Sequence, residues 1–296
     1  MSAPETEVAG ANVPETIGGL RIVGELGRGS TGVVYLAHDP SQDREVAIKV
    51  YHLEGGAEQE QIARSMFLGE AHLVGKLQHP HILPIYDAGE EDGRCYIVTE
   101  YMKDARTLAA YCQPGGLLDI ATVLKVMFKC ATALDYAHTR GVIHRDVKPS
   151  NILLTQGRDV RIIDFSIALV AGSQVERIEG IAGSPFYMSP EQVQSLPLTH
   201  RSDLYSLGAV MYELLTGSRP FKANTLEKLL HRIVYATPPP IHTLNREVPE
   251  EVENVVAIAL QKDPDARYRD GLDFAAELSR VHQRLCGAGV RIEYQT

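Results

Sequence analysis

The sequence has few cysteines, no long hydrophobic run and too few basic residues to balance its acids. Cys95, Cys112, Cys130 and Cys286 show neither a CxxC pattern nor a metal-binding spacing. We therefore expect reduced, buried thiols and not disulfides or zinc ligands. No apolar run approaches the roughly eighteen residues that a membrane span needs. The net charge of −9 argues against broad binding to nucleic acid or to anionic membranes.

The amino-terminal stretch also lacks the features of a signal peptide, because acids stand where bases are needed and no apolar segment follows. Residues 1–16 are polar and contain two prolines, so we expect a disordered tail there. We expect a soluble, cytoplasmic protein. The remaining composition is that of a globular chain: 296 residues, 44% hydrophobic, enough for one large domain or two lobes.

Short apolar runs separated by Asp-Pro, Gly-Gly and Asp-Gly breaks predict an antiparallel sheet within residues 17–102. One helix is predicted inside this region, over residues 58–78. Its apolar positions recur at the helical period of 3.6 residues, and we expect them to face the core. They include Ile62, Met66, Leu73, Val74 and Leu77.

The pattern becomes helical after Met102. We predict a larger helical lobe over residues 103–284, followed by a tail over residues 285–296, and we find no internal repeat. The predicted helices of this lobe span residues 119–139, 203–216, 225–235, 249–261 and 272–284.

A glycine-rich stretch, Gly27-Arg-Gly29-Ser-Thr-Gly32, lies between two strand patterns. Glycines let backbone amides approach phosphate groups closely. A dinucleotide-binding fold would open a helix directly after such a loop. A strand pattern follows instead, so we exclude that fold. A glycine-rich hairpin without a ligand stays the alternative.

A lysine and a glutamate occupy apolar settings in the first lobe. Lys49 ends the run Val46-Ala-Ile-Lys49 and by alternation shares a strand face with Ala47. Glu70 falls inside the apolar stripe of the helix, where a carboxylate is costly unless it is paired. We predict an ion pair between Lys49 and Glu70; the alternative is an exposed lysine.

A third stretch, His144-Arg-Asp146-Val-Lys148-Pro-Ser-Asn151, places a carboxylate, a lysine and a carboxamide in six residues between a helix and a strand. Asp164-Phe165 and Ser189-Pro-Glu191 follow. Together with the glycine loop, Lys49 and Glu70, these motifs occur in the order of the protein-kinase signature set. From about residue 17 to 284 the chain resembles eukaryotic-like serine/threonine kinases, of the kind common in bacteria.

The resemblance implies an α+β, two-lobed protein-kinase-like fold, with a small antiparallel β-rich N-lobe that contains one helix and a larger, mostly α-helical C-lobe. It also implies an ATP-dependent kinase that transfers the γ-phosphoryl group to Ser/Thr hydroxyls of protein substrates, with autophosphorylation. ATP and Mg²⁺ (or Mn²⁺) are the implied cofactors. By family analogy alone, the partners include a transient homodimer.

The resemblance also assigns roles to residues. Asp146 would orient the substrate hydroxyl and Lys148 would neutralise the transferred phosphoryl group. Asn151 and Asp164 would bind the metal, and Lys49, held by Glu70, would contact the phosphates. The positions assigned to the nucleotide are Gly27, Gly29, Gly32, Val34, Ala47, Lys49, Glu100, Met102 and Leu153.

Four further residues are given structural roles. His144 is interpreted as a packed scaffold histidine, and Asp203 resembles the aspartate that braces the catalytic loop. Glu191 and Arg267 resemble a buried ion pair.

Two departures from the family pattern concern the segment after Asp164. Ser166 replaces the usual glycine, and no threonine occurs between Asp164 and Glu191. Ser184 is interpreted as structural, so Ser173 is the main candidate phosphoacceptor. We expect this segment to rely weakly on phosphorylation, with Glu176 or Glu179 as a partner for Arg145. The alternatives are an ATP-binding pseudokinase and, less favoured, a small-molecule phosphotransferase.

Overall fold

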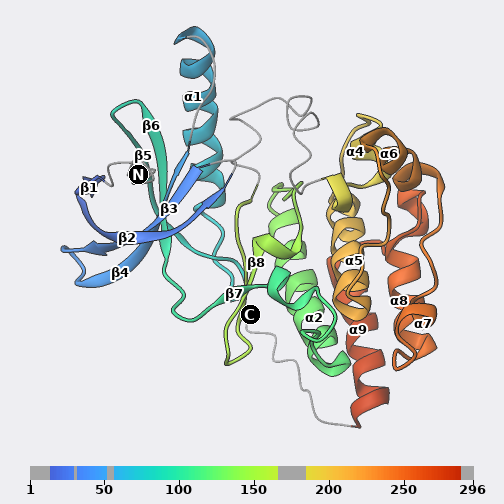
Figure 1. Ribbon diagram of the computed structural model, residues 1–296. Helices are drawn as coiled ribbons and strands as arrows, with labels where there is room; N and C mark the ends of the chain where they lie inside the picture. Colours follow the sequence, from blue (N-terminus) through green and yellow to red (C-terminus); the bar gives the residue numbers. More distant parts are fainter. Residues whose placement is uncertain (1–13, 30–31, 52–56, 166–184, 288–296) are drawn as a thin grey trace, which may run out of the picture.

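The smaller lobe consists of an antiparallel sheet and one long helix (Figure 1). The computed structural model describes residues 14–29, 32–51, 57–165 and 185–287. The elements of this lobe are β1 (Thr16–Ile17), β2 (Leu20–Gly29), β3 (Gly32–Asp39), β4 (Arg44–Tyr51), α1 (Ala57–Val74), β5 (Ile85–Glu91) and β6 (Arg94–Glu100).

The sheet has the order β1-β2-β3-β4-β6-β5, and every neighbouring pair is antiparallel. The glycine-rich stretch joins β2 to β3, with Gly29 opposite Gly32. Gly32 has a φ of +152°, and a Cβ there would lie 1.9 Å from the backbone oxygen of Val50. A side chain at this position would clash with β4, so the third glycine of the loop is required by packing alone.

Strand β4 shows the predicted alternation. Val46, Ile48 and Val50 are buried on one face of the sheet, in a cluster with residues of β3 and β6. Ala47 and Lys49 lie on the other face and are only partly buried. That second face borders the cleft between the lobes.

Helix α1 forms, but it ends at Val74 and not at the predicted residue 78, and it buries a different side. Phe67, Ala71 and Val74 are buried in the core. Three residues of the predicted stripe are each more than half exposed, namely Ile62, Met66 and Leu73. The prediction is correct for Val74 and Leu77 and wrong for these three. Both sets of positions recur at the helical period, and the large ring of Phe67 takes the buried side.

The larger lobe is mostly helical, as predicted, and each of the five predicted helices is present. Asp119 caps α2 by accepting a hydrogen bond from the Thr122 amide at 2.8 Å. Gly217, with a φ of +69°, ends α5. The elements are β7 (Arg106–Thr107), η1 (Leu108–Tyr111), α2 (Ile120–His138), η2 (Pro149–Asn151), β8 (Ile152–Leu154), β9 (Val160–Ile162), η4 (Pro185–Tyr187), α4 (Pro190–Val193), α5 (His200–Thr216), α6 (Leu226–Tyr235), α7 (Ile241–Leu244), α8 (Glu250–Ala259), η5 (Pro264–Ala266) and α9 (Gly271–Cys286).

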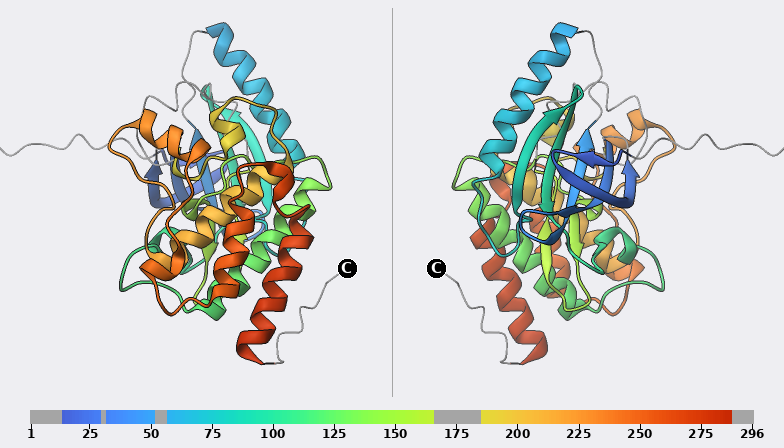
Figure 2. Two further views of the ribbon diagram at one scale, coloured as in Figure 1. Left: turned by 90° about the vertical axis from the view of Figure 1, so that its right-hand side faces the viewer. Right: turned by 90° about the vertical axis from the view of Figure 1, so that its left-hand side faces the viewer.

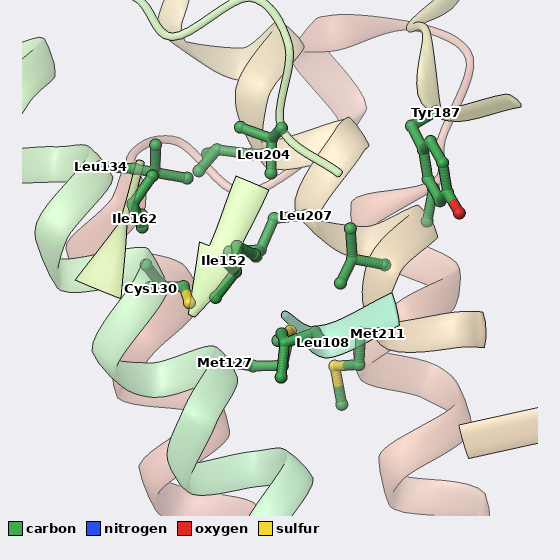
Figure 3. Packing of buried hydrophobic residues seen from close by; sticks show 14 of the residues in the cluster. Leu108, Met127, Cys130, Leu134, Ile152, Ile162, Tyr187, Leu204, Leu207 and Met211 are labelled. Carbon is green, nitrogen blue, oxygen red and sulfur yellow. The ribbon is translucent and has the colours of Figure 1, made fainter. Parts of the chain in front are cut away.

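One large hydrophobic core joins the two lobes. Figure 3 shows its centre, where α2 and α5 pack against β8 and β9; labelled residues there include Met127, Leu134, Ile152, Ile162 and Leu207. In Figure 2 α1 stands at the end of the molecule opposite α9. The segment after α1 is fixed to the larger lobe, because the Leu83 amide donates to the Ile162 oxygen at 2.9 Å and Ile82 forms a parallel bridge with Ile162.

Three of the four cysteines are buried as free thiols, which agrees with the prediction, and burial raises the pKa of Cys95 to about 11. Cys286 is exposed, so the prediction of a buried thiol is wrong there. In the described part of the chain, no helix combines the length and the apolar character needed to cross a membrane.

Candidate active site

Two adjoining cavities fill the cleft between the lobes. The inner one measures about 530 Å³ and the outer one about 570 Å³. They share six lining residues, so they form one continuous cleft: Gly27, Val34, Lys49, Thr107, Ile163 and Asp164.

The predicted nucleotide-binding residues all border this cleft. The inner cavity is lined mainly by apolar side chains, and both β4 and the segment after β6 contribute to it. Its lining includes Gly27, Val34, Ala47, Lys49, Glu100, Met102 and Leu153. Gly29 and Gly32 line the outer cavity instead, beside the catalytic loop.

The catalytic loop brings its polar groups together at the outer cavity. The Lys148 Nζ lies 2.7 Å from Asp146 Oδ2. The Asn151 side-chain amide donates to the Asp146 backbone oxygen at 2.9 Å and to its Oδ2 at 3.2 Å. Asp146 is thus oriented by a cation and a carboxamide from its own loop.

Asp203 of α5 stabilises the start of this loop through hydrogen bonds to its backbone. It is almost fully buried, and its carboxylate accepts hydrogen bonds from the amides of His144 and Arg145, each at 2.8 Å. The His138 Nε2 lies 2.7 Å from the same carboxylate. Burial alone would raise the pKa of Asp203, but the bond and charge of His138, with the His144 contacts, lower it.

His144 is a packed part of the loop, as interpreted from the sequence. Its ring is fully buried and lies 4.6 Å from the Phe165 ring, centroid to centroid. Its Nδ1 accepts from the Asp146 amide at 3.2 Å, so the proton resides on Nε2, which donates to the Ile163 oxygen at 2.9 Å. Neither nitrogen is left to act on a substrate.

The predicted ion pair between Lys49 and Glu70 is not formed in this structure. The Lys49 Nζ instead lies 2.7 Å from Asp164 Oδ2. The buried Oε2 of Glu70 has no hydrogen-bond partner in the described part of the chain. Burial raises the pKa of Glu70, and the charge of Arg145 opposes this shift. The lysine pairs with the acid that lines the same cavity, and the glutamate does not line it.

The two predicted metal ligands border the outer cavity and offer oxygen atoms. Because the Asn151 Nδ2 donates to Asp146, its carbonyl oxygen is the atom left for a cation. Within the described ranges, no group of three or more His, Cys, Asp or Glu residues could hold a metal ion. Two oxygen ligands suit a magnesium ion that keeps phosphate and water ligands, and they do not suit a dedicated protein cage.

A further cluster beside the catalytic loop had no counterpart in the sequence prediction. The Tyr187 hydroxyl donates to Glu213, and the Arg219 Nε lies 3.6 Å from the other oxygen of this carboxylate. Tyr187 and Arg219 both line the outer cavity. The fold brings Tyr187 of η4 to Glu213 and Arg219, which lie close together in sequence at and just after the end of α5.

The expected pair of Glu191 and Arg267 is present and buried, with two hydrogen bonds of 2.7 and 2.8 Å. Burial alone would raise the pKa of Glu191, but its bonds to Arg267 and Ser202 lower it. The expectations for the segment after Asp164 lie outside the described residues: Ser166, Ser173, Glu176, Glu179 and Ser184. So do residues 1–13 of the expected tail and residues 288–296.

Comparison with known proteins agrees with this geometry. The family model described as the protein kinase domain matches residues 20–277. The serine/threonine-protein kinase PrkC of Bacillus subtilis is 37% identical over 88% of this chain and 40% of its own length. The serine/threonine-protein kinase PknB of Mycolicibacterium smegmatis is 35% identical over 87% of this chain and 42% of its own length. The chain thus spans about two fifths of the length of these curated relatives.

A solved structure agrees as well. The crystal structure of the PknI kinase domain of Mycobacterium tuberculosis matches with a TM-score of 0.72 at 27% identity, over 90% of this chain and 98% of that chain. The predicted fold class, a sheet-based small lobe and a helical large lobe, is confirmed.

Proposed function

Because the chain belongs to the protein kinase domain family, we propose that it transfers the γ-phosphoryl group of ATP to serine and threonine hydroxyls of protein substrates. One observation carries the proposal. A single cavity is bordered by Asp146, Lys148, Asn151 and Asp164. It continues past Lys49 into the inner cavity, which is lined mainly by apolar side chains. The names of PrkC and PknB, both serine/threonine-protein kinases, support the choice of acceptor.

The inner cavity would hold the adenine ring between Val34 and Ala47 on one side and Leu153 on the other. The backbone at Glu100 and Met102 would supply the polar contacts. The phosphates would then extend past Lys49 under the glycine loop, where backbone amides can approach them. Lys49 lines both cavities, so it lies where the apolar base and the charged phosphates of the nucleotide would meet. This place suits a lysine that contacts the phosphates.

Asn151 and Asp164 would hold the metal ion, whose charge screens the phosphates when it is bound. Asp146 would orient the substrate hydroxyl and accept its proton, since its carboxylate faces the outer cavity. Lys148, 2.7 Å from Asp146 Oδ2, is close enough to stabilise negative charge on the transferred group. The cytoplasmic location, the transient homodimer and the choice between Mg²⁺ and Mn²⁺ stay predictions.

The pseudokinase alternative gains no support, because Lys49, Asp146, Lys148, Asn151 and Asp164 are all present and border the cleft. The experiment is radiolabelled phosphate transfer by the wild-type chain and by Asp146→Asn. We expect the variant to lose a factor of about 10² to 10⁴ in rate, the usual contribution of a positioned base. Its affinity for a fluorescent ATP analogue should change little.

Asp92→Asn is the matched control. Asp92 lies in the exposed turn between β5 and β6 with a φ of +49°, a conformation that asparagine tolerates, and it lines neither cavity of the cleft. It should transfer phosphate at the wild-type rate. Equal incorporation by wild type and Asp146→Asn would disprove the proposed function.

A further inference from the structure

The wall of the outer cavity beyond Asp146 carries an arginine that the catalytic roles do not use. Arg219 follows α5 and lines this cavity together with Asp146, Lys148, Ser150 and Tyr187. A peptide that places its hydroxyl at Asp146 would pass along this wall. The side chains on the wall therefore meet the residues that flank the phosphoacceptor.

The Arg219 guanidinium is held in place by an aromatic ring and a carboxylate. Its guanidinium carbon lies 3.8 Å from the centroid of the Phe186 ring, which is a cation–π contact. Its Nε lies 3.6 Å from a Glu213 oxygen, and Glu213 is itself buried and accepts a hydrogen bond from Tyr187. The planar group is thus fixed by a ring and a carboxylate, which reduces the entropy that a ligand contact would cost.

The outer end of the guanidinium is open to the cleft. The Arg219 side chain is 36% exposed. Within the described residues, the terminal nitrogens of Arg219 donate no hydrogen bond. Glu213, its partner, does not line the cavity. A ligand in the cleft would meet the cation and not its counter-ion.

The other cations that line the outer cavity are already paired, including Arg28, whose Nη2 lies 2.8 Å from Glu25 Oε2. Lys49 pairs with Asp164 and Lys148 with Asp146, each at 2.7 Å. Ser150, exposed beside the catalytic loop, is neutral. Apart from the two paired acids, the described lining of the outer cavity offers no carboxylate that would attract a basic peptide.

We propose that Arg219 is a specificity-determining residue that binds an anionic side chain of the substrate close to the phosphoacceptor. A guanidinium can bind a carboxylate or a phosphate through two parallel hydrogen bonds, so glutamate, aspartate and phosphoserine share the required chemistry. This inference rests on the proposed kinase activity and adds the substrate class that the cleft prefers.

The test uses serine peptides in a neutral background, with a single Glu, phosphoserine, Ala or Arg placed in turn at each position near the acceptor. At one position the wild-type kcat/KM should be about fivefold to tenfold higher with the anion than with Ala, as expected of a half-exposed charge-assisted contact. The Glu and phosphoserine arms show which anion is preferred. Arg219→Gln should lose this ratio while its kcat/KM for the Ala peptide stays within about twofold.

Two variants separate charge from fold. Arg219→Lys should keep part of the preference, and Arg219→Glu should shift it toward Arg peptides. Arg284→Gln is the matched control, because Arg284 of α9 forms an exposed ion pair with Glu251 of α8. This variant should keep the full ratio. Melting temperatures check that each variant is folded.

The inference fails if the wild type shows no preference for an anion at any position, or if Arg219→Gln retains it. A chain that phosphorylates no peptide and no protein would instead count against the proposed function. Binding then decides about Arg219: a labelled Glu peptide should bind the wild type, with a non-hydrolysable ATP analogue present, about fivefold more tightly than it binds Arg219→Gln. Equal binding would overturn the inference.

Discussion

Two carboxylates, Asp203 beneath the catalytic loop and Glu70 on α1, differ in how fully their oxygen atoms are paired. Beneath the catalytic loop, the buried carboxylate of Asp203 is bonded to two amides and to His138. On α1, the buried Oε2 of Glu70 has no hydrogen-bond partner within the described residues. The pKa of Asp203 is lowered, whereas that of Glu70 is raised.

This difference in pairing means that the catalytic loop and helix α1 are stabilised in different ways. The catalytic loop is fixed by bonds that exist before any ligand binds, so its geometry is built into the fold. The α1 side holds a carboxylate whose charged form is unfavourable where it lies. Substitutions of the two carboxylates should therefore change stability in opposite directions.

The largest effect is expected for Asp203→Asn. Asparagine offers one acceptor oxygen where the carboxylate offers two, so a buried amide or His138 would lose its partner. We expect the free energy of unfolding to fall by about 3 kcal/mol or more. Urea titration followed by circular dichroism measures it. Asp43→Asn is the control, since Asp43 is 96% exposed and its φ of +48° suits asparagine. A loss below about 1 kcal/mol would contradict the bracing role.

A second pair of variants tests how α1 is attached to the core. Phe67→Ala should lower the free energy of unfolding by about 3 to 4 kcal/mol, because the ring is fully buried against Tyr51. Met66→Ala, at the preceding residue of the same helix, should change the free energy of unfolding by less than about 0.5 kcal/mol. Thermal or urea unfolding of both proteins gives the comparison. Similar losses would restore the apolar stripe that the sequence predicted.

The smallest effect, and the opposite sign, is expected for Glu70→Gln. A carboxyl whose pKa is higher in the folded than in the unfolded chain lowers stability as the pH rises above its ordinary value of 4.5. Glutamine should therefore raise the free energy of unfolding at pH 7 by about 0.5 to 1 kcal/mol. The gain should disappear near pH 4. Urea titrations of both proteins at these two pH values decide; a loss of stability at pH 7 would show that Glu70 is paired.

Much of the cleft could be predicted from sequence, because each motif ends a strand or opens a loop that the fold brings to one place. Asp146, Lys148 and Asn151 lie within six residues, so local chain geometry alone keeps them close. The sheet alternation correctly placed Lys49 and Ala47 on one face.

The remaining features depend on choices that a pattern does not make. Lys49 is within reach of one of two acids, and only the position of α1 decides between Glu70 and Asp164. Periodicity likewise allowed α1 to bury Met66 or Phe67. Arg219 gave no signal, since the ring of Phe186 that packs on it comes from another segment of the chain.

The anchoring of the chain after α1 has a mechanical consequence. Ile82 and Leu83 are bonded to Ile162 of the larger lobe, so the chain that follows the carboxyl end of the helix is fixed to that lobe. At 1.5 Å per residue, Glu70 lies about 6 Å from the helix end at Val74, and Ile62 about 18 Å. A rotation of α1 about that end would therefore move the Glu70 carboxylate about a third as far as the exposed side chain of Ile62.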